Sequence, residues 1–154
     1  MARRTDQRVK VAVLNGPNLN LLGVREPDLY GQETLSDIEK NLENVARELG
    51  VTLSFQQHNG EGQLVDAIHA LRGKVDAALV NAGAYTHTSL AIRDALVGTS
   101  IPFVEVHLTN IYSREAERRK SALADAAVAV VAGFGSYGYE LALRGLVRSR
   151  KKNG

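Results

Sequence analysis

VKVAVLNGPN, residues 9–18, is the stretch that decides the fold, because a short apolar run stops abruptly at asparagine, glycine and proline. Short runs rich in valine, leucine and alanine are typical of strands that are buried on both faces of a parallel sheet. The chain contains five such runs, at residues 9–14, 51–56, 77–80, 102–106 and 127–132. The sequence therefore predicts five strands.

Between the strands, apolar residues recur every three or four positions, which predicts amphipathic helices. The clearest stripes are Leu35, Ile38, Leu42, Val45 and Leu49; Leu64, Ile68 and Leu71; and Tyr139, Leu143, Leu146 and Val147. Thr34 is placed to cap the first helix, and Gly50, Gly73 and Gly98 are placed to end helices in a left-handed conformation. Strict alternation of strand and helix predicts a doubly wound, flavodoxin-like α/β fold, in which helices cover both faces of a five-stranded parallel sheet.

Composition indicates one domain over residues 1–154, since a chain of this length with 44% hydrophobic residues can bury a sizeable core. The absence of cysteine excludes disulfides and thiolate metal sites and favours a cytoplasmic setting. No apolar run is long enough for a signal peptide or a membrane span, so no membrane partner is expected. Basic residues gather in two expected flexible tails, 1–8 and 149–154, which favour solubility over nucleic-acid binding.

The connection after the first strand, residues 16–33, is unusually long, and we expect residues 22–32 to form a lid over an active site. A loop without function is the alternative. Arg25 and Tyr30 lie in this segment. A nearby cation lowers the pKa of a phenol toward the range of a general base, so the pair suggests an activated tyrosine.

Polar residues follow the strands at the sheet edge where ligands bind in open α/β folds. They are Asn15 and Asn18 after the first strand, His58 and Asn59 after the second, Asn81 and His87 after the third, and Glu105, His107, Thr109 and Asn110 around the end of the fourth. His107 could instead be an ordinary buried histidine, and Asn81 and His87 could merely cap a helix. His58 and His69 are expected to be peripheral. Several imidazoles and amides on one rim favour a site.

Arginines gather in the polar stretch 113–121, which contains Arg114, Arg118 and Arg119. Guanidinium groups bind carboxylates in a bidentate manner, so at least one of these arginines is a candidate clamp for an anionic substrate. Ion pairs with Glu115 or Glu117 on the same helix remain the alternative.

Five motifs together resemble the type II dehydroquinase family over nearly the whole chain. They are LNGPNLNLLG at 14–23, REPDLYG at 25–31, NAGAYTHTS at 81–89, EVHLTN at 105–110 and GFGSYGYELAL at 133–143. The resemblance implies a lyase that removes water from 3-dehydroquinate by anti elimination through an enolate, giving 3-dehydroshikimate. The step belongs to the shikimate pathway of aromatic amino acid biosynthesis, although quinate catabolism uses the same reaction. The resemblance also implies no metal or organic cofactor, and a homododecamer built as a tetramer of trimers.

The same resemblance implies a role for each polar residue. Tyr30, activated by Arg25, would be the base, and Asn18 would hold the water that stabilises the enolate oxygen. His107, oriented by Glu105 and assisted by Asn81, would protonate the leaving hydroxyl. The implied substrate-binding residues are Asn81, His87, Leu108, Thr109, Arg114 and Arg118, with Asp94 reaching the site of a neighbouring subunit.

Four residues depart from the family pattern, namely His58, Gly60, Tyr112 and Glu117. Thr109 stands where serine is more usual but keeps a hydroxyl. None of these changes removes an implied catalytic group, whereas Glu117 alters the surroundings of Arg118 and hence bears on substrate affinity.

Other functions are less well supported by the residues. GFGSYG at 133–138 matches the GxGxxG dinucleotide motif, but it lies on the last strand-to-helix turn and lacks an acidic partner downstream, so tight packing explains its glycines better. A receiver-like binding module would need acidic residues where Asn15 and Asn81 stand. A Schiff-base mechanism would need a desolvated lysine near the strand ends. A noncatalytic module or inactive homologue remains the alternative to an enzyme.

Overall fold

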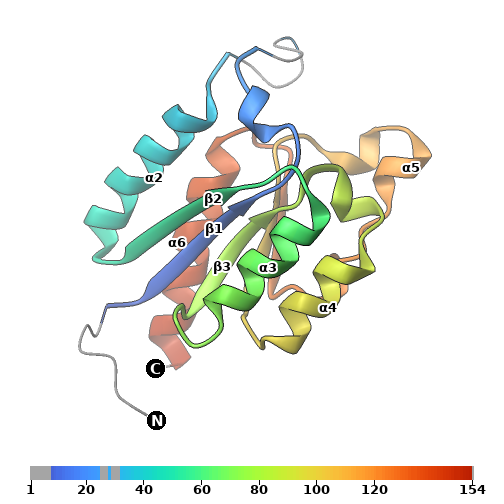
Figure 1. Ribbon diagram of the computed structural model, residues 1–154. Coiled ribbons are helices and arrows are strands. Elements are labelled where there is room, and N and C mark those ends of the chain that lie inside the picture. The colour runs from blue at the N-terminus through green and yellow to red at the C-terminus, as the bar shows by residue number, and fades with distance from the viewer. Residues whose placement is uncertain (1–7, 25–27, 29–31, 154) are drawn as a thin grey trace.

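The computed structural model describes residues 8–24, 28 and 32–153, and it shows a five-stranded parallel sheet between two layers of helices (Figure 1). The strands are β1 (Lys10–Asn15), β2 (Thr52–Gln57), β3 (Ala77–Asn81), β4 (Phe103–His107) and β5 (Ala129–Ala132). Their order in the sheet is β2-β1-β3-β4-β5, which is the flavodoxin-like order. The predicted fold class is confirmed.

The helices are α2 (Leu35–Leu49), α3 (Glu61–Leu71), α4 (Leu90–Gly98), α5 (Ala116–Arg119) and α6 (Tyr137–Asn153), with short 3-10 turns at Leu19–Leu21, Gly83–His87, Ile111–Ser113 and Ala124–Ala126. The connection between β4 and β5 differs from the predicted alternation, because α5 is a single turn. Its sequence has no apolar stripe that a longer helix could bury. At the C-terminus, α6 runs to Asn153, so residues 149–153 are helical where a flexible tail was expected.

Each face of the sheet has its own apolar core, because successive side chains of a strand point to opposite sides. Val11 and Val13 of β1 pack with α2 and α6, whereas Ala12 and Leu14 pack with α3 and α4. Figure 1 shows the same division, with α2 and α6 on one side of the sheet and α3 and α4 on the other. The sheet is therefore covered on both faces.

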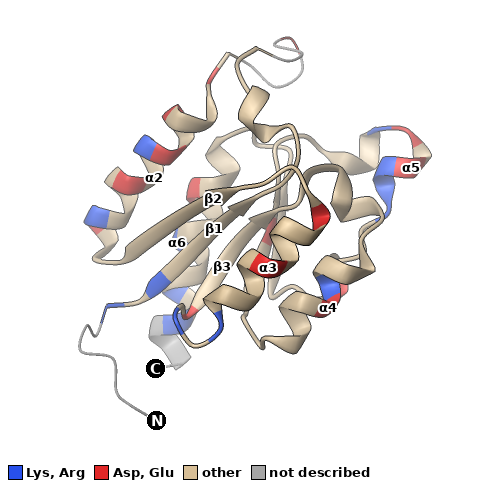
Figure 2. Ribbon diagram, viewed as in Figure 1, with Lys and Arg blue, Asp and Glu red and all other residues tan. Residues whose placement is uncertain are grey.

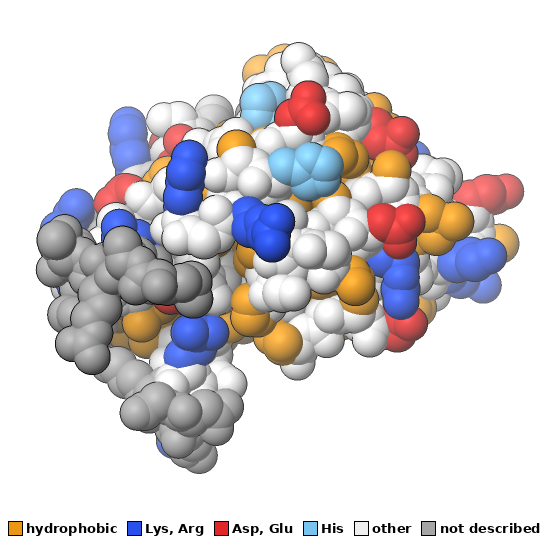
Figure 3. Space-filling model, turned by 60° about the horizontal axis from the view of Figure 1, so that its bottom comes forward, with side chains coloured by type: hydrophobic (Ala, Val, Ile, Leu, Met, Phe, Trp, Pro, Cys, Tyr) orange, Lys and Arg blue, Asp and Glu red, His pale blue; other side chains and the backbone are white. Residues whose placement is uncertain are grey.

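Charged residues lie mainly on the helices and loops (Figure 2). On the face shown in Figure 3, Lys and Arg side chains are interspersed with Asp and Glu among the described residues. Within the strands the charged residues are Lys10 and Glu105, and Glu105 has no exposed surface. A fully buried carboxylate in the middle of a strand is costly and needs specific partners.

Helix ends follow the expected signals at two positions and depart from them at a third. Thr34 caps α2 through a capping box with Asp37, in which each backbone N–H donates to the other side chain. Gly50 ends α2 with φ 71°. Gly98, however, is the last residue of α4, and the left-handed residue is Ser100 with φ 56°, so the prediction for Gly98 was wrong.

The backbone that follows β1 lies in very close contact with the end of β3, at the point where the strand order reverses. Gly16 N–H donates to Asn81 O at 2.7 Å, and a Cβ atom on Gly16 would lie 2.3 Å from Ala82 O. Only glycine fits there, because any side chain would collide with backbone that the sheet holds in place.

We expect Gly16→Ala to lower the free energy of unfolding by about 2–4 kcal/mol, since neither backbone segment can move without breaking the sheet edge. Gly145→Ala is the matched control: Gly145 lies within α6 with nothing within 4 Å of its added Cβ. This change should stabilise the chain by about 0.5–1 kcal/mol. Urea denaturation of both variants measures the difference, and equal stability of the two would contradict this account of Gly16.

Candidate active site

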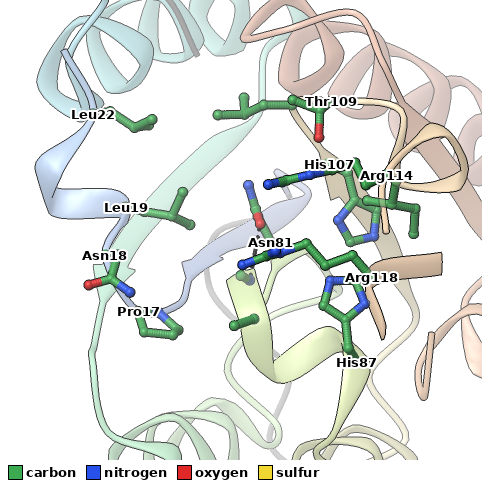
Figure 4. Close-up of a pocket in the computed structure, with 14 residues that line it drawn as sticks. Pro17, Asn18, Leu19, Leu22, Asn81, His87, His107, Thr109, Arg114 and Arg118 are labelled. Carbon is green, nitrogen blue, oxygen red and sulfur yellow. Dashed lines mark hydrogen bonds between the residues drawn. The ribbon is translucent and has the colours of Figure 1, made fainter. Parts of the chain in front are cut away.

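A pocket of about 130 Å³ opens beyond the carboxyl ends of β1, β3 and β4 (Figure 4). This is the edge of the sheet where the chain reverses its winding and where ligands bind in folds of this kind. The residues that line it are Pro17, Asn18, Leu19, Leu22, Asn81, Gly83, Ala84, His87, His107, Leu108, Thr109, Ile111, Arg114 and Arg118. Eight of the residues singled out in the sequence thus meet in one cavity.

The remaining predicted residues lie elsewhere. Asp94 lies on α4 in a separate depression with His69 and Arg72. Glu105 lies behind His107 and does not line the pocket. Arg25 and Tyr30 fall outside the described residues, as does most of the expected lid at 22–32.

His107, at the end of β4, is 5% exposed and faces a buried carboxylate. Its Nε2 lies 3.2 Å from Glu105 Oε2, although the two atoms do not form a well-aligned hydrogen bond. The other ring nitrogen, Nδ1, is therefore the one that does not face Glu105. An imidazole backed by a carboxylate is the arrangement expected of a group that holds and delivers a proton.

His87, in the turn after β3, has a defined orientation. Its Nδ1 lies 2.7 Å from Lys120 O. A carbonyl oxygen can only accept, so Nδ1 carries the proton and Nε2 of the neutral ring is an acceptor. The ring lies beside Arg118 at the pocket (Figure 4). His87 therefore offers an acceptor to a ligand hydroxyl when neutral, or a second donor when protonated.

Asn81 is held by a buried hydrogen-bond chain that crosses the sheet end. Its Nδ2 donates to Tyr139 Oη at 3.0 Å, and Tyr139 Oη donates to Asn15 Oδ1 at 2.5 Å. On its other side, Asn81 Oδ1 accepts from Gly83 N–H, but Asn81 is not a helix cap, because Ala82 precedes the 3-10 turn and Ser89 caps α4. Burial raises the pKa of Tyr139 far above its usual value, which keeps the phenol protonated as a donor.

Tyr139 was not predicted to be part of the site. It appeared only as one member of the apolar stripe of α6. The sole hint was a phenol on a core-facing stripe, because a fully buried tyrosine hydroxyl needs a partner.

Asn18 lies at the pocket rim in the left-handed conformation, with φ 69°. Its backbone N–H donates to Asn59 Oδ1 at 3.0 Å, and Gln57 Nε2 donates to the same oxygen and to Gly16 O, each at 3.0 Å. The end of β2 therefore fixes the turn that presents Asn18 to the pocket.

Two arginines make the opposite wall cationic. Arg114 and Arg118 both line the pocket, and Arg118 also forms an ion pair with Glu115. The predicted ion pair of Arg118 is thus confirmed, with Glu115 and not the exposed Glu117 as the paired carboxylate, whereas its role as a clamp for an anionic substrate stays a prediction. None of the described lining residues is Asp or Glu. The cavity accordingly favours a small anion that carries several hydroxyl groups.

The glycines of 133–138 have a packing role. Gly135 N–H donates to Leu108 O at 2.8 Å, and a Cβ atom on Gly138 would lie 3.3 Å from Val131 Cγ1. They bring the start of α6 against the loop that follows β4. Among the described residues, no group of three or more His, Asp or Glu side chains is placed to hold a metal ion, and no helix is long and apolar enough to cross a membrane.

Comparison with known proteins agrees with this geometry. The family model described as dehydroquinase class II matches residues 9–147. A Gemmatimonas aurantiaca protein named 3-dehydroquinate dehydratase is 60% identical over 139 residues, which cover 90% of this chain and 91% of that protein. A Neosartorya fischeri protein named catabolic 3-dehydroquinase 2 is 55% identical over 138 residues, which cover 90% and 92%. The crystal structure of a type II dehydroquinase from Butyrivibrio crossotus, 36% identical, matches with a TM-score of 0.89 over 92% of this chain and 99% of that one.

We expect Tyr139→Phe to lower the free energy of unfolding by about 2 kcal/mol or more, because it leaves polar atoms of Asn15 and Asn81 buried without a partner. Tyr137→Phe is the matched control, since the Tyr137 side chain is 53% exposed, and it should change stability by less than about 0.5 kcal/mol. Urea denaturation gives both values. A Tyr139→Phe protein as stable as the control would show that the buried hydrogen bonds from Asn81 to Tyr139 and from Tyr139 to Asn15 do not stabilise the site.

Proposed function

The chain belongs to the class II dehydroquinase family and dehydrates 3-dehydroquinate to 3-dehydroshikimate, and we propose that the pocket at the ends of β1, β3 and β4 carries out this elimination. The observation that carries the proposal is a small cavity in which two arginines and two histidines meet, with no carboxylate in its described lining. 3-Dehydroquinate is a small carboxylate with several hydroxyls and a ketone, so its charge and its hydrogen-bonding groups suit this lining.

Substrate binding is assigned from the direction of each donor and acceptor. Arg118 and Arg114 pair with the substrate carboxylate or its neighbouring hydroxyls. The second N–H of Asn81 Nδ2 and the Nε2 atom of His87 remain for substrate hydroxyls, because their other polar atoms are already bonded. The backbone of Leu108 and Thr109 completes the wall at the end of β4.

The elimination needs one base, one acid and a stabiliser of the enolate. Tyr30, activated by Arg25, removes a proton from the carbon next to the ketone, and the electron pair moves onto the carbonyl oxygen. Asn18 holds a water that hydrogen-bonds to this oxygen. The enolate then collapses, the carbon–oxygen bond to the departing hydroxyl breaks, and His107 supplies the proton that turns the hydroxyl into water.

His107 is suited to the acid role by its surroundings. A buried carboxylate 3.2 Å behind the ring holds the imidazole in place to deliver a proton. Asn81 lies on the same pocket wall and aligns the departing hydroxyl. No step requires a redox centre.

Assembly and setting complete the proposal. We propose a homododecamer made of trimers, in which Asp94 from α4 enters the active site of a neighbouring subunit. Support comes from the position of Asp94, which lies outside its own pocket, and from exposed apolar residues on the same helix, Leu90 and Val97.

A cytoplasmic setting accords with a chain that has no cysteine. Biosynthesis through shikimate is the proposed role, although one relative, 55% identical, is named a catabolic 3-dehydroquinase.

We expect purified protein mixed with 3-dehydroquinate to produce the ultraviolet absorbance of the enone in 3-dehydroshikimate. Tyr30→Phe should lower kcat by at least about 10²-fold, because it removes the base, and His107→Asn should do the same by removing the acid. Tyr112→Phe, which changes an exposed tyrosine, is the control and should keep full activity.

Borohydride added with substrate separates this mechanism from one that passes through an imine. Activity should survive, because no lysine forms a covalent intermediate. Loss of activity on borohydride treatment, or full activity of Tyr30→Phe, would contradict the proposed mechanism. A wild-type protein that produces no enone would sink the enzymatic function itself.

Asp94 gives a separate test of the assembly. Sedimentation equilibrium should give a mass twelve times the 16.7 kDa of one chain. Asp94→Ala and Tyr30→Phe should each have low activity alone, yet mixed trimers formed by refolding them together should regain activity. In a mixed trimer, one site combines the native Tyr30 of one chain with the native Asp94 of its neighbour. No recovery would show that Asp94 does not act across subunits.

A further inference from the structure

Glu105 is a fully buried carboxylate whose two oxygens have different neighbours. Oε2 faces His107 Nε2, and Oε1 accepts a hydrogen bond from the hydroxyl of Ser121. A buried carboxylate is costly unless donors satisfy its oxygens. The contacts of Glu105 therefore determine how firmly it supports His107.

The geometry around Ser121 fixes the direction of that hydrogen bond. Leu123 N–H donates to Ser121 Oγ at 3.1 Å, and Ala124 N–H donates to it at 3.0 Å. A hydroxyl has two lone pairs and one hydrogen, so both lone pairs are occupied. The single hydrogen is left to be donated to Glu105 Oε1, which must then act as an acceptor.

The segment that carries Ser121 is held at both sides of this residue. Lys120 O accepts from His87 Nδ1 at 2.7 Å, Ala122 N–H donates to Thr86 O at 2.8 Å, and Arg93 Nη1 donates to Ala122 O at 2.9 Å. Two adjacent residues, Lys120 and Ser121, thus set the orientation of both histidines in the pocket, one directly and one through Glu105.

We propose that Ser121 is a positioning residue for the elimination, because its hydroxyl holds Glu105 Oε1 and so fixes the carboxylate that lies behind His107. This inference rests on the proposed role of His107 as the acid. Ser121 does not line the pocket and touches no substrate. Its effect passes through Glu105, so it should alter the chemical step and leave substrate binding unchanged.

The kinetic test compares three substitutions at one position. Ser121→Ala should lower kcat roughly tenfold while KM stays within about twofold, because the lost hydrogen bond weakens proton delivery. Ser121→Thr keeps the hydroxyl and should restore most of the wild-type kcat. Ser121→Cys, close in size but a weaker donor, should fall between Ala and Thr. The control is Ser113→Ala, since the Ser113 hydroxyl donates to Asn110 O in the same stretch and does not reach Glu105.

A spectroscopic signature tests the same point without turnover. In protein labelled with ¹⁵N-histidine, the ring signal of the His107 nitrogen that faces Glu105, identified by its absence in His107→Asn, reports the position of the carboxylate. The signal should stay in place in Ser121→Thr and shift in Ser121→Ala. The other three histidines serve as internal references.

The outcomes separate this inference from the proposed function. An unchanged His107 signal in Ser121→Ala, or a KM increase as large as the fall in kcat, overturns the positioning role even when the wild type is active. A wild type without activity overturns the enzymatic function, whereas the His107 signal still reports on Ser121. If Ser121→Ala does not fold, Ser121→Cys decides, because a Cys variant with the wild-type signal and kcat contradicts the inference.

Discussion

The hydrogen bond from Gly16 N–H to Asn81 O, 2.7 Å long, is the contact on which the site depends. It joins Asn81, the last residue of β3, to the residue that follows β1, and beyond it the two backbone segments must part because α2 and α4 follow on opposite faces of the sheet. Because the two segments diverge, a space remains between them beyond the strand ends. The pocket is a consequence of the winding, and the glycine permits the strands to stay paired up to its edge.

The polar groups at this edge are satisfied by one another, so the bonds that stabilise the fold also orient the chemistry. Tyr139 from the last helix joins Asn15 and Asn81 at the ends of two neighbouring strands. The orientation of the Asn81 carboxamide is consequently fixed, since Gly83 N–H can only donate to it, and Tyr139, whose hydrogen is donated to Asn15, accepts from it. An orientation of this kind adds no reorganisation free energy to the reaction, because the hydrogen bonds that fix it already form during folding.

Much of this could be predicted from the sequence, because strands, helix stripes and the polar residues after each strand are local patterns. The sheet, the first helix with its Thr34 cap and the meeting of Asn81 with His107 all follow from such patterns and from the rule that parallel strands end at one edge. Tyr139 and Ser121 could not be recognised, since their partners are distant in sequence; Tyr139 and Asn15 are 124 residues apart. The prediction that Gly98 ends a helix in a left-handed conformation was wrong, because the sequence does not distinguish a glycine inside the last helical turn from one that follows it.

The placement of charge follows from what the pocket must bind. A carboxylate beside His107 orients the imidazole, but a carboxylate on the pocket wall would repel an anionic substrate. β4 resolves this conflict by spacing the two residues two apart, so that Glu105 and His107 point to the same side of the strand, with the carboxylate one step deeper. The protein then has to stabilise a charge with no access to water, and a hydroxyl can do so without adding a cation that would compete for the carboxylate. The side of Glu105 away from His107 is therefore where a neutral donor is needed, and Ser121 occupies it.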